Sequence, residues 1–167
     1  VKPKPARKSG QHVLRPYQQR AVDAIIADLA EEVSTLLVMA TGLGKTQVFS
    51  EVAKHFVATG RVMVLAHREE QIFQAKKRLQ DITGHLVDVE MGELWADDQS
   101  MMVDAAKVVV STVQSQNAGK EGRMKRFSPH EFSLVIVDEC FPTGTMVDGV
   151  PIESIQVGDL TRSHSGQ

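Results

Sequence analysis

Apolar residues recur at two spacings along this chain, and together they predict helices that alternate with buried strands. Helical spacing behind Pro16 predicts an amphipathic helix over 16–31, and steps of four residues predict a second helix over 45–58. A third helical pattern covers residues 68–79. Short runs of consecutive apolar residues predict strands at 36–39, 62–65, 86–89, 108–110 and 134–137. Continuous apolar strands separated by helices are typical of a parallel sheet covered on both faces, the doubly wound α/β class.

Two stretches at the ends fall outside this alternation. Residues 1–12 contain prolines and four cations, without an acid or an apolar period, which predicts a flexible basic tail. Residues 140–167 carry turn signals at Asp148-Gly149 and Gly158-Asp159 between short apolar stretches, which predict β-hairpins. Residues 13–139 are therefore the single α/β domain that a chain of 167 residues leads us to expect.

Composition places the chain in the ordinary globular range and narrows its partners. Hydrophobic residues make up 42% and charged residues 24%, which is enough apolar material for a core. The net charge of −2 is not that of a polycation, so any contact with nucleic acid must come from local patches. One basic cluster is expected to be solvated surface rather than a DNA track; it consists of Lys120, Arg123, Lys125 and Arg126.

Cysteine and histidine usage predicts where the protein works and which metals it lacks. The single cysteine, Cys140, rules out an internal disulfide and suits a reducing compartment, so we expect a cytoplasmic protein. No apolar run approaches the ~18 residues of a membrane span, so no membrane partner is expected. The six histidines show no zinc-ligand spacing.

A phosphate-binding loop is predicted between the strand at 36–39 and the helix at 45–58. The segment Thr41-Gly42-Leu43-Gly44-Lys45-Thr46 ends in the Gly-Lys-Thr of a Walker A loop, although Met39 stands where the general pattern begins with Gly. A tight turn with little side-chain bulk presents backbone N–H groups to phosphate, and the helix N-terminus adds partial positive charge. Lys45 would reach the β- and γ-phosphates, and the Thr46 hydroxyl would ligate Mg²⁺. ATP with Mg²⁺ is the expected cofactor.

An acidic pair follows the last predicted strand. Asp138 and Glu139 come directly after the apolar run at 134–137, at the strand end where a nucleotide site needs a second acidic element. Asp138 would bind Mg²⁺ through its water shell, and Glu139 would orient and deprotonate the attacking water. Such pairs are often solvated strand ends, so the prediction depends on the Lys45 loop.

Residues 13–139 resemble the first RecA-like domain of superfamily-2 helicases and translocases, closest to the DNA-directed members related to restriction-enzyme motor subunits and bacterial DNA-repair helicases. The segment Leu14-Arg15-Pro16-Tyr17-Gln18 resembles their opening motif, which implies that Gln18 reads the adenine edge and that Arg15 lies beside the base. Segments 64–70 and 110–115 resemble two later motifs and imply that Arg68, Thr112 and Gln114 contact a nucleic-acid backbone, most simply DNA. Solvated loop polarity is the alternative for both segments.

The resemblance stops after Glu139, and residues 140–167 look like the first block of an intein, the N-terminal piece of a Hint fold. This likeness rests on the leading Cys140 and on a set of small and turn residues: Gly144-Thr145-Met146-Val147, Gly149, Ile152, Ile155 and Gly158-Asp159-Leu160. It implies that Cys140 attacks the Glu139 carbonyl in an N-to-S acyl shift. An ordinary cysteine in a divergent helicase is the alternative.

The expected function is an ATP-dependent DNA helicase or translocase motor domain whose acidic motif is interrupted by an intein that begins at Cys140. Its partners would be nucleic acid, a second RecA-like domain, a complementary intein segment and a C-extein. Because 28 residues cannot complete a Hint domain, residues 140–167 should not splice alone, and both a split intein and a truncated gene record remain open. We expect residues 1–167 by themselves to be almost inactive as an ATPase. A trans-splicing precursor and a stand-alone nucleotide-binding module are the other candidate functions.

Overall fold

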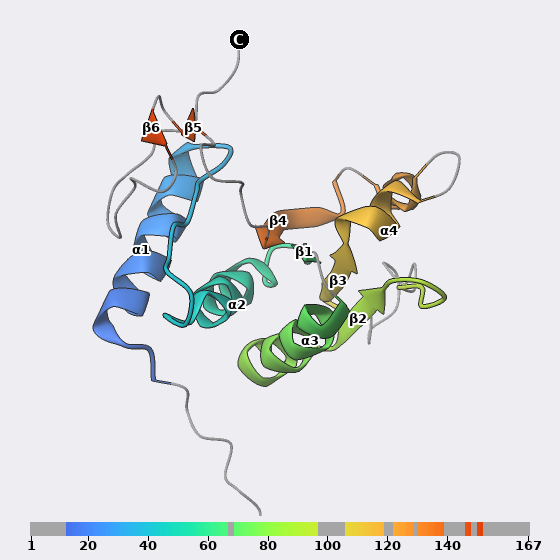
Figure 1. Cartoon of the computed structure of the whole chain (residues 1–167), viewed down its shortest axis with the longest axis horizontal. Coiled ribbons are helices and arrows are strands. Elements are labelled where there is room, and N and C mark those ends of the chain that lie inside the picture. Colours follow the sequence, from blue (N-terminus) through green and yellow to red (C-terminus); the bar gives the residue numbers. More distant parts are fainter. Residues whose placement is uncertain are drawn as a thin grey trace, which may run out of the picture.

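The computed structural model describes residues 13–66, 69–96, 106–118, 122–128 and 130–138, together with the backbone of 146–147 and 150–151 (Figure 1). The helices are α1 (Pro16–Glu31), α2 (Lys45–Phe56), α3 (Glu69–Thr83), α4 (Val113–Asn117) and the 3-10 helix η1 (Arg123–Arg126). The strands are β1 (Arg61–Ala66), β2 (Val87–Glu90), β3 (Val108–Thr112), β4 (Phe132–Asp138), β5 (Met146–Val147) and β6 (Val150–Pro151).

Four strands form a parallel sheet in the order β2-β3-β1-β4, which confirms the predicted α/β class with a parallel sheet. Strand β1 lies in the middle, where Val62 pairs with Val108 of β3 and with Leu134 of β4. All six residues of β1 and all five of β3 are buried, as expected for strands that read as continuous apolar runs.

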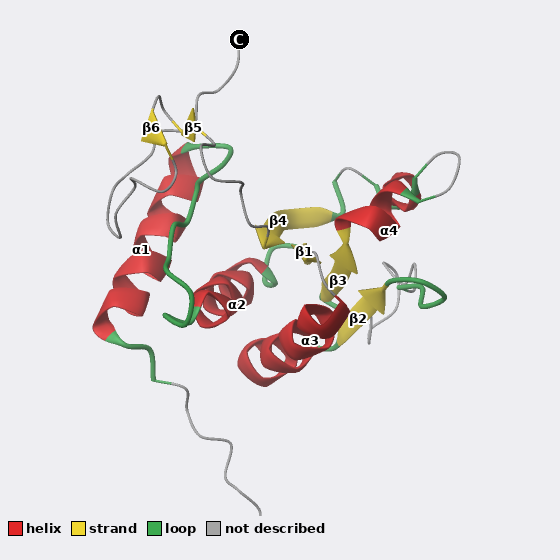
Figure 2. Cartoon of the chain, viewed as in Figure 1, coloured by secondary structure: helices red, strands yellow, loops and turns green. Residues whose placement is uncertain are grey.

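Helices α2 and α3 cover one face of the sheet (Figure 2). Their inward side chains meet alternate valines of β1, β2 and β3 in the main core, whose helical members are Phe49, Ala53, Ile72, Ala75 and Leu79. The sequence therefore located α1 and α3 correctly, and it placed the end of α2 two residues too late. Helix α4 and η1 were not predicted.

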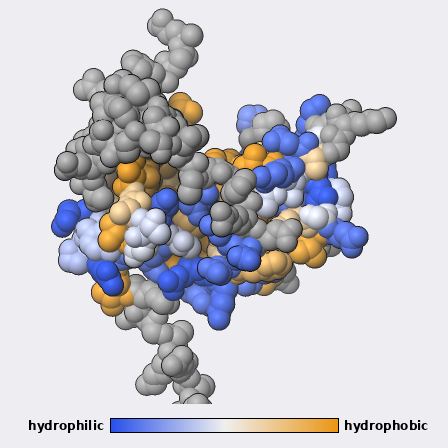
Figure 3. Space-filling view, viewed as in Figure 1, coloured by the Kyte–Doolittle hydropathy of each residue, from blue (hydrophilic) through white to orange (hydrophobic). Residues whose placement is uncertain are grey.

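The opposite face of the sheet is covered only in part by the described residues, which corrects the expectation of a sheet covered on both sides. Met63, Leu65 and Val109 pack there with Phe127, which follows η1. Val135 and Val137 of β4 pair with Met63 and Leu65 and share their face, yet they are 48% and 55% exposed. Hydrophobic surface is visible where Figure 1 draws β4 (Figure 3).

The strand predicted at 36–39 does not form in the described sheet, and this prediction is wrong. Leu37 and Met39 instead pack against α1 and α2, in a cluster with Val22, Val48 and Val52. A run of apolar residues can be buried against helices as well as within a sheet, and the hydrophobic pattern does not distinguish the two. Strand β4 consequently lies at an edge of the sheet.

Beyond residue 138 the described backbone forms an antiparallel pair, β5 with β6, in which Val147 pairs with Val150. This pairing agrees with the β-hairpin material predicted beyond residue 139. The turn signals at Asp148-Gly149 and Gly158-Asp159, the domain boundary at residue 139 and the tail 1–12 lie outside the described residues and stay predictions. No helix in the described chain is long and apolar enough to cross a bilayer.

Candidate nucleotide-binding site

The loop before α2 has the conformation that its glycines permit. Gly42 and Gly44 both adopt φ of +85°, and Gly44 is the N-cap of α2 in the left-handed region. The N–H groups of Gln47 and Val48 donate to the Gly44 carbonyl, at 2.9 and 3.2 Å. The amides before them in the first turn have no partner within the helix, as at any helix start, and they are the groups that can bind an anion.

A polar latch ties the start of α1 to this loop. The Gln18 side-chain amide donates to the Leu43 carbonyl at 2.9 Å, and the Tyr17 hydroxyl donates to the same oxygen at 3.0 Å. The other end of the Gln18 amide accepts from the backbone N–H of Arg15 at 2.9 Å. Gln18 is buried, and the Arg15 side chain is exposed with its guanidinium 3.3 Å from the Tyr17 hydroxyl. The Gln18 amide therefore holds the loop through its donor and the start of α1 through its acceptor.

The latch requires a glycine at position 44. A Cβ on Gly44 would lie 2.5 Å from the Gln18 amide nitrogen, which is closer than real Cβ contacts. A Cβ on Gly42 would meet nothing within 4 Å. The sequence predicts Gln18 and Gly44 as separate site residues, but it indicates neither their close approach nor the contribution of Tyr17. The sign of this contact in the sequence is the glycine immediately before Lys45, because a residue without a side chain lets another side chain approach its Cα.

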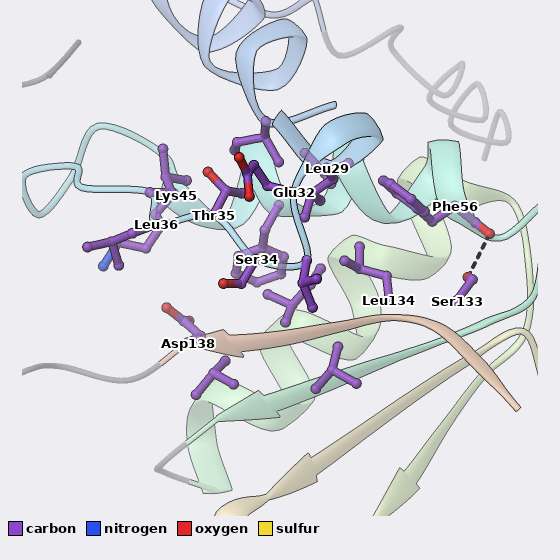
Figure 4. Close-up of a pocket in the computed structure, with 18 of the residues that line it drawn as sticks. Leu29, Glu32, Ser34, Thr35, Leu36, Lys45, Phe56, Ser133, Leu134 and Asp138 are labelled. Atoms are coloured by element: carbon purple, nitrogen blue, oxygen red, sulfur yellow. Dashed lines mark hydrogen bonds between the residues drawn. The ribbon is translucent and has the colours of Figure 1, made fainter. Parts of the chain in front are cut away.

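Lys45 and Asp138 line one cavity of about 1000 Å³, and Figure 4 shows them at the same end of it. One wall is the extended segment from Glu32 to Met39, and the other is β4. Among the described residues, neither side chain makes a hydrogen bond or an ion pair, and both are half-buried. The ammonium group and the carboxylate are thus available to a ligand. At the far end of the cavity, the Ser133 hydroxyl donates a hydrogen bond to the Phe56 carbonyl at 3.0 Å.

The remaining predicted site residues are placed differently. Thr41 is exposed at the tip of the loop, and Thr46 is half-buried in the first turn of α2. Thr112 is buried at the carboxyl end of β3, where its hydroxyl caps α4 by accepting the Ser115 N–H at 3.0 Å. Gln114 follows it and is exposed. Three further predicted residues lie outside the described residues: Arg68, Glu139 and Cys140.

A buried carboxylate lies at the carboxyl end of β2, and no pattern in the sequence indicates that it is buried. The Glu90 side chain is fully buried, and its Oε1 is 3.1 Å from the Arg126 guanidinium. Burial raises the pKa of Glu90, while Arg126, Arg123 and a hydrogen bond from the Ala96 backbone oppose that rise. Oε2 has no hydrogen-bond partner among the described residues. Among those residues, no group of three or more side chains could hold a metal ion by itself.

A family model described as the res subunit of type III restriction enzymes matches residues 11–146, most of the chain. The chain belongs to this family. Membership in the res-subunit family agrees with the helicase-type motor that the motifs resemble. No curated protein sequence matches the chain.

Solved structures show the same fold for this res-subunit family member. One is described as a nuclease-deletion mutant of the Type ISP restriction-modification enzyme LlaGI in complex with a DNA substrate mimic. The two share 22% identity with a TM-score of 0.59, over 76% of this chain and 15% of that one. At this identity the likeness shows the fold alone, and the chain spans about 15% of the length of that enzyme.

Proposed function

We propose that this chain carries the ATP-binding half of an ATP-dependent motor that moves along DNA as a helicase or translocase. The observation that supports it most is the shared cavity, which brings the Lys45 ammonium and the Asp138 carboxylate to one end in a member of the res-subunit family. A triphosphate that carries a divalent cation needs a positively charged side chain for its phosphates and a carboxylate for the cation, at the same end of a site.

Each residue of the site has a role in this proposal. The backbone from Thr41 to Thr46 surrounds the phosphates, and Lys45 neutralises the β- and γ-phosphates. The Thr46 hydroxyl and the Asp138 carboxylate are hard oxygen donors of the kind that Mg²⁺ prefers, so the residues fit the ion. Bound Mg²⁺ would neutralise charge on the phosphates. Glu139 would take the proton of the attacking water.

The base of ATP would lie at the start of α1. Gln18 keeps an amide hydrogen and a lone pair beyond the latch, so it can contact the adenine edge and the Leu43 carbonyl together. Arg15 is exposed beside it and is proposed to flank the base. Bound nucleotide would thereby be connected to the loop through a single side chain.

Nucleic acid is the proposed second partner, and the enzyme described above, which was solved with a DNA substrate mimic, supports DNA. Gln114 is exposed beyond the carboxyl end of β3 and is proposed to contact the phosphodiester backbone, together with Arg68. Thr112 is buried as a helix cap, so we assign it to positioning Gln114. A second RecA-like domain would complete the motor.

The motor is tested with two variants of the complete ATPase. Lys45→Ala should abolish ATP binding, because the phosphates lose their ammonium group. Glu139→Gln should bind ATP but stop hydrolysis, because the amide cannot accept the proton. Lys54→Ala, on the exposed side of the same helix, is the matched control and should behave as the native protein. Equal loss of binding in Lys45→Ala and Glu139→Gln would refute the roles.

We also propose that the motor is interrupted by an intein from Cys140. The supporting observation is the antiparallel hairpin β5–β6, which departs from the parallel sheet eight residues after β4 ends. The Cys140 thiol would attack the Glu139 carbonyl carbon. A C–S bond forms, the Glu139–Cys140 C–N bond breaks, and the thiol proton passes to the freed amine.

The intein is tested by supplying a complementary intein segment and a C-extein to the chain. The expected product is a ligated chain that contains Glu139 without residues 140–167, detected by mass spectrometry. Cys140→Ala should abolish ligation, because a methyl group cannot accept the acyl chain. Ligation that survives this substitution would show that Cys140 is an ordinary residue.

A further inference from the structure

The single tryptophan of the chain lies beyond the end of β2, with more than half of its surface exposed. Trp95 is 53% exposed, and two guanidinium groups nevertheless lie against its ring. The guanidinium carbon of Arg123 is 3.9 Å from the ring centroid, and that of Arg126 is 4.7 Å from it. The part of the ring that the guanidiniums leave uncovered faces solvent.

Hydrogen bonds on both sides of Trp95 hold this arrangement in place. Arg123 donates to the carbonyls of Gly92 and Leu94, at 2.5 and 3.4 Å. Arg126 donates to Glu90 at 3.1 Å and to the Ala96 carbonyl at 3.2 Å. The loop from β2 is thus fixed immediately before and immediately after the tryptophan. Figure 1 shows this loop and η1 at the same end of the molecule.

The contacts that hold Trp95 at the surface include a buried charge and contribute little stability, which argues that the exposure of the ring serves a function. The Glu90 side chain is fully buried, and burying a carboxylate with its partner gives little net stability. A ring needed only for packing would gain more from burial than from exposure. The Trp95 cluster, which consists of Glu90, Trp95, Arg123 and Arg126, therefore presents an aromatic surface rather than hiding one.

The charge around the exposed ring favours an anionic partner. Helix η1 contributes Arg123, Lys125 and Arg126 within four residues, and Glu93 is an exposed carboxylate in the neighbouring turn. The Glu90 charge is already paired with Arg126. Leu94, which precedes Trp95 in the chain, and Met124 of η1 are exposed apolar residues, at 48% and 41%. Bases have apolar faces and phosphates are anionic, and this surface offers both complements.

We propose that the Trp95 cluster is a stacking platform for an unpaired base of single-stranded nucleic acid. A base would lie on the uncovered part of the indole ring, and Lys125 and Arg123 would meet the adjoining phosphates. A duplex base has both faces covered by its neighbours, so the platform selects single strands. The inference rests on nucleic acid as the partner in the proposed function, and it gives the basic cluster a binding role in place of the solvated surface that the sequence predicts.

The platform is tested with a fluorescently labelled oligo(dT) strand and the complete chain. Because Trp95 is the only tryptophan, its emission reports on this site alone. We expect oligo(dT) to quench the emission at the concentrations at which the strand binds. Trp95→Ala should weaken binding roughly 5- to 100-fold, which corresponds to the loss of one stacked base. Trp95→Phe should keep most of the affinity because it keeps an aromatic face.

Phe73→Ala is the matched control, because Phe73 is 52% exposed on α3, outside the Trp95 cluster. It should leave binding unchanged. Strand binding that is equal in the native chain and in Trp95→Ala, without quenching, would overturn the platform and leave the proposed motor intact. Equal quenching by a duplex would overturn the preference for single strands. Absence of any strand binding at low salt would reject both the platform and the nucleic-acid partner.

Glu90 acts as a positioning residue, which a separate readout can check. Glu90→Gln removes the charge that holds Arg126, so the ring should turn more freely in the free protein. Time-resolved anisotropy of the Trp95 emission should then show a larger fast component, and strand affinity should fall less than in Trp95→Ala. An unchanged anisotropy decay together with unchanged affinity would show that Glu90 does not support the platform.

Discussion

Gly42 and Gly44 have the same backbone angle but different surroundings, so alanine at each position separates backbone strain from side-chain contact. Both have φ of +85° in the phosphate-binding loop. A Cβ on Gly42 meets nothing, whereas one on Gly44 meets the Gln18 amide nitrogen at 2.5 Å. Gly42→Ala should therefore show strain alone, and Gly44→Ala should show strain together with loss of the latch.

The magnitudes follow from this difference. A left-handed alanine costs about 1–2 kcal/mol relative to glycine, and both variants carry this loss of unfolding free energy. In Gly44→Ala the Gln18 amide must also move, although it is buried and hydrogen-bonded to Leu43 and Arg15. Leaving a buried polar group unsatisfied costs a further ~1–3 kcal/mol. The two variants should differ by this second amount.

Urea denaturation of the two variants measures the difference, and a double variant tests its cause. In a Gln18→Ala background the obstacle is gone, so Gly44→Ala should lose only as much unfolding free energy as Gly42→Ala. ATP affinity measured by calorimetry should fall further in Gly44→Ala than in Gly42→Ala, because only the former displaces the latch. Equal losses in the native background, or a Gly44→Ala penalty that persists without Gln18, would refute the latch.

Three other perturbations have definite expected outcomes. Arg61→Ala should lower the unfolding free energy by about 3–5 kcal/mol in urea denaturation, because Arg61 forms a buried ion pair with Glu131 and its loss leaves the Glu131 carboxylate unpaired. Lys54→Ala, which removes an exposed ammonium group paired with Glu51, should change the unfolding free energy by less than about 0.5 kcal/mol. Burial raises the pKa of Glu90, so the folded protein holds a proton that the unfolded chain has released, and unfolding free energy should fall as pH rises from the ordinary carboxyl pKa through the raised one. Glu90→Gln should remove that slope from a pH series of denaturation curves, and a slope identical to that of the native chain would contradict the assignment. DNA affinity should fall linearly with the logarithm of salt concentration, because phosphate contacts release counterions, and a salt-independent affinity would argue against backbone contacts.

The sequence was sufficient to locate the helices and strands that bury one face or their whole surface. The pattern behind Pro16 located α1, and the valine runs located β1, β3 and β4, because periodicity reports which face of an element is apolar. The strand predicted at 36–39 was wrong because an apolar run shows that a segment is buried but does not show against which element. Leu37 and Met39 are buried against helices.

The contacts within the site depend on the three-dimensional arrangement and were not predictable. Gln18 and Leu43 are 25 positions apart and Glu90 and Arg126 are 36 apart, and nothing in either local pattern indicates the other. The Trp95 cluster was missed because its two arginines read as one solvated basic run. Only their stacking on the ring and the burial of Glu90 distinguish them from surface charge.

Direct titration of the chain with ATP and Mg²⁺ shows whether the Lys45 loop is a nucleotide site. Isothermal calorimetry should show weak binding to the native chain and to Lys54→Ala, and no binding to Lys45→Ala, while all three unfold at the same urea concentration. Equal ATP affinity in Lys45→Ala and the native chain would show that the Lys45 loop does not bind the nucleotide.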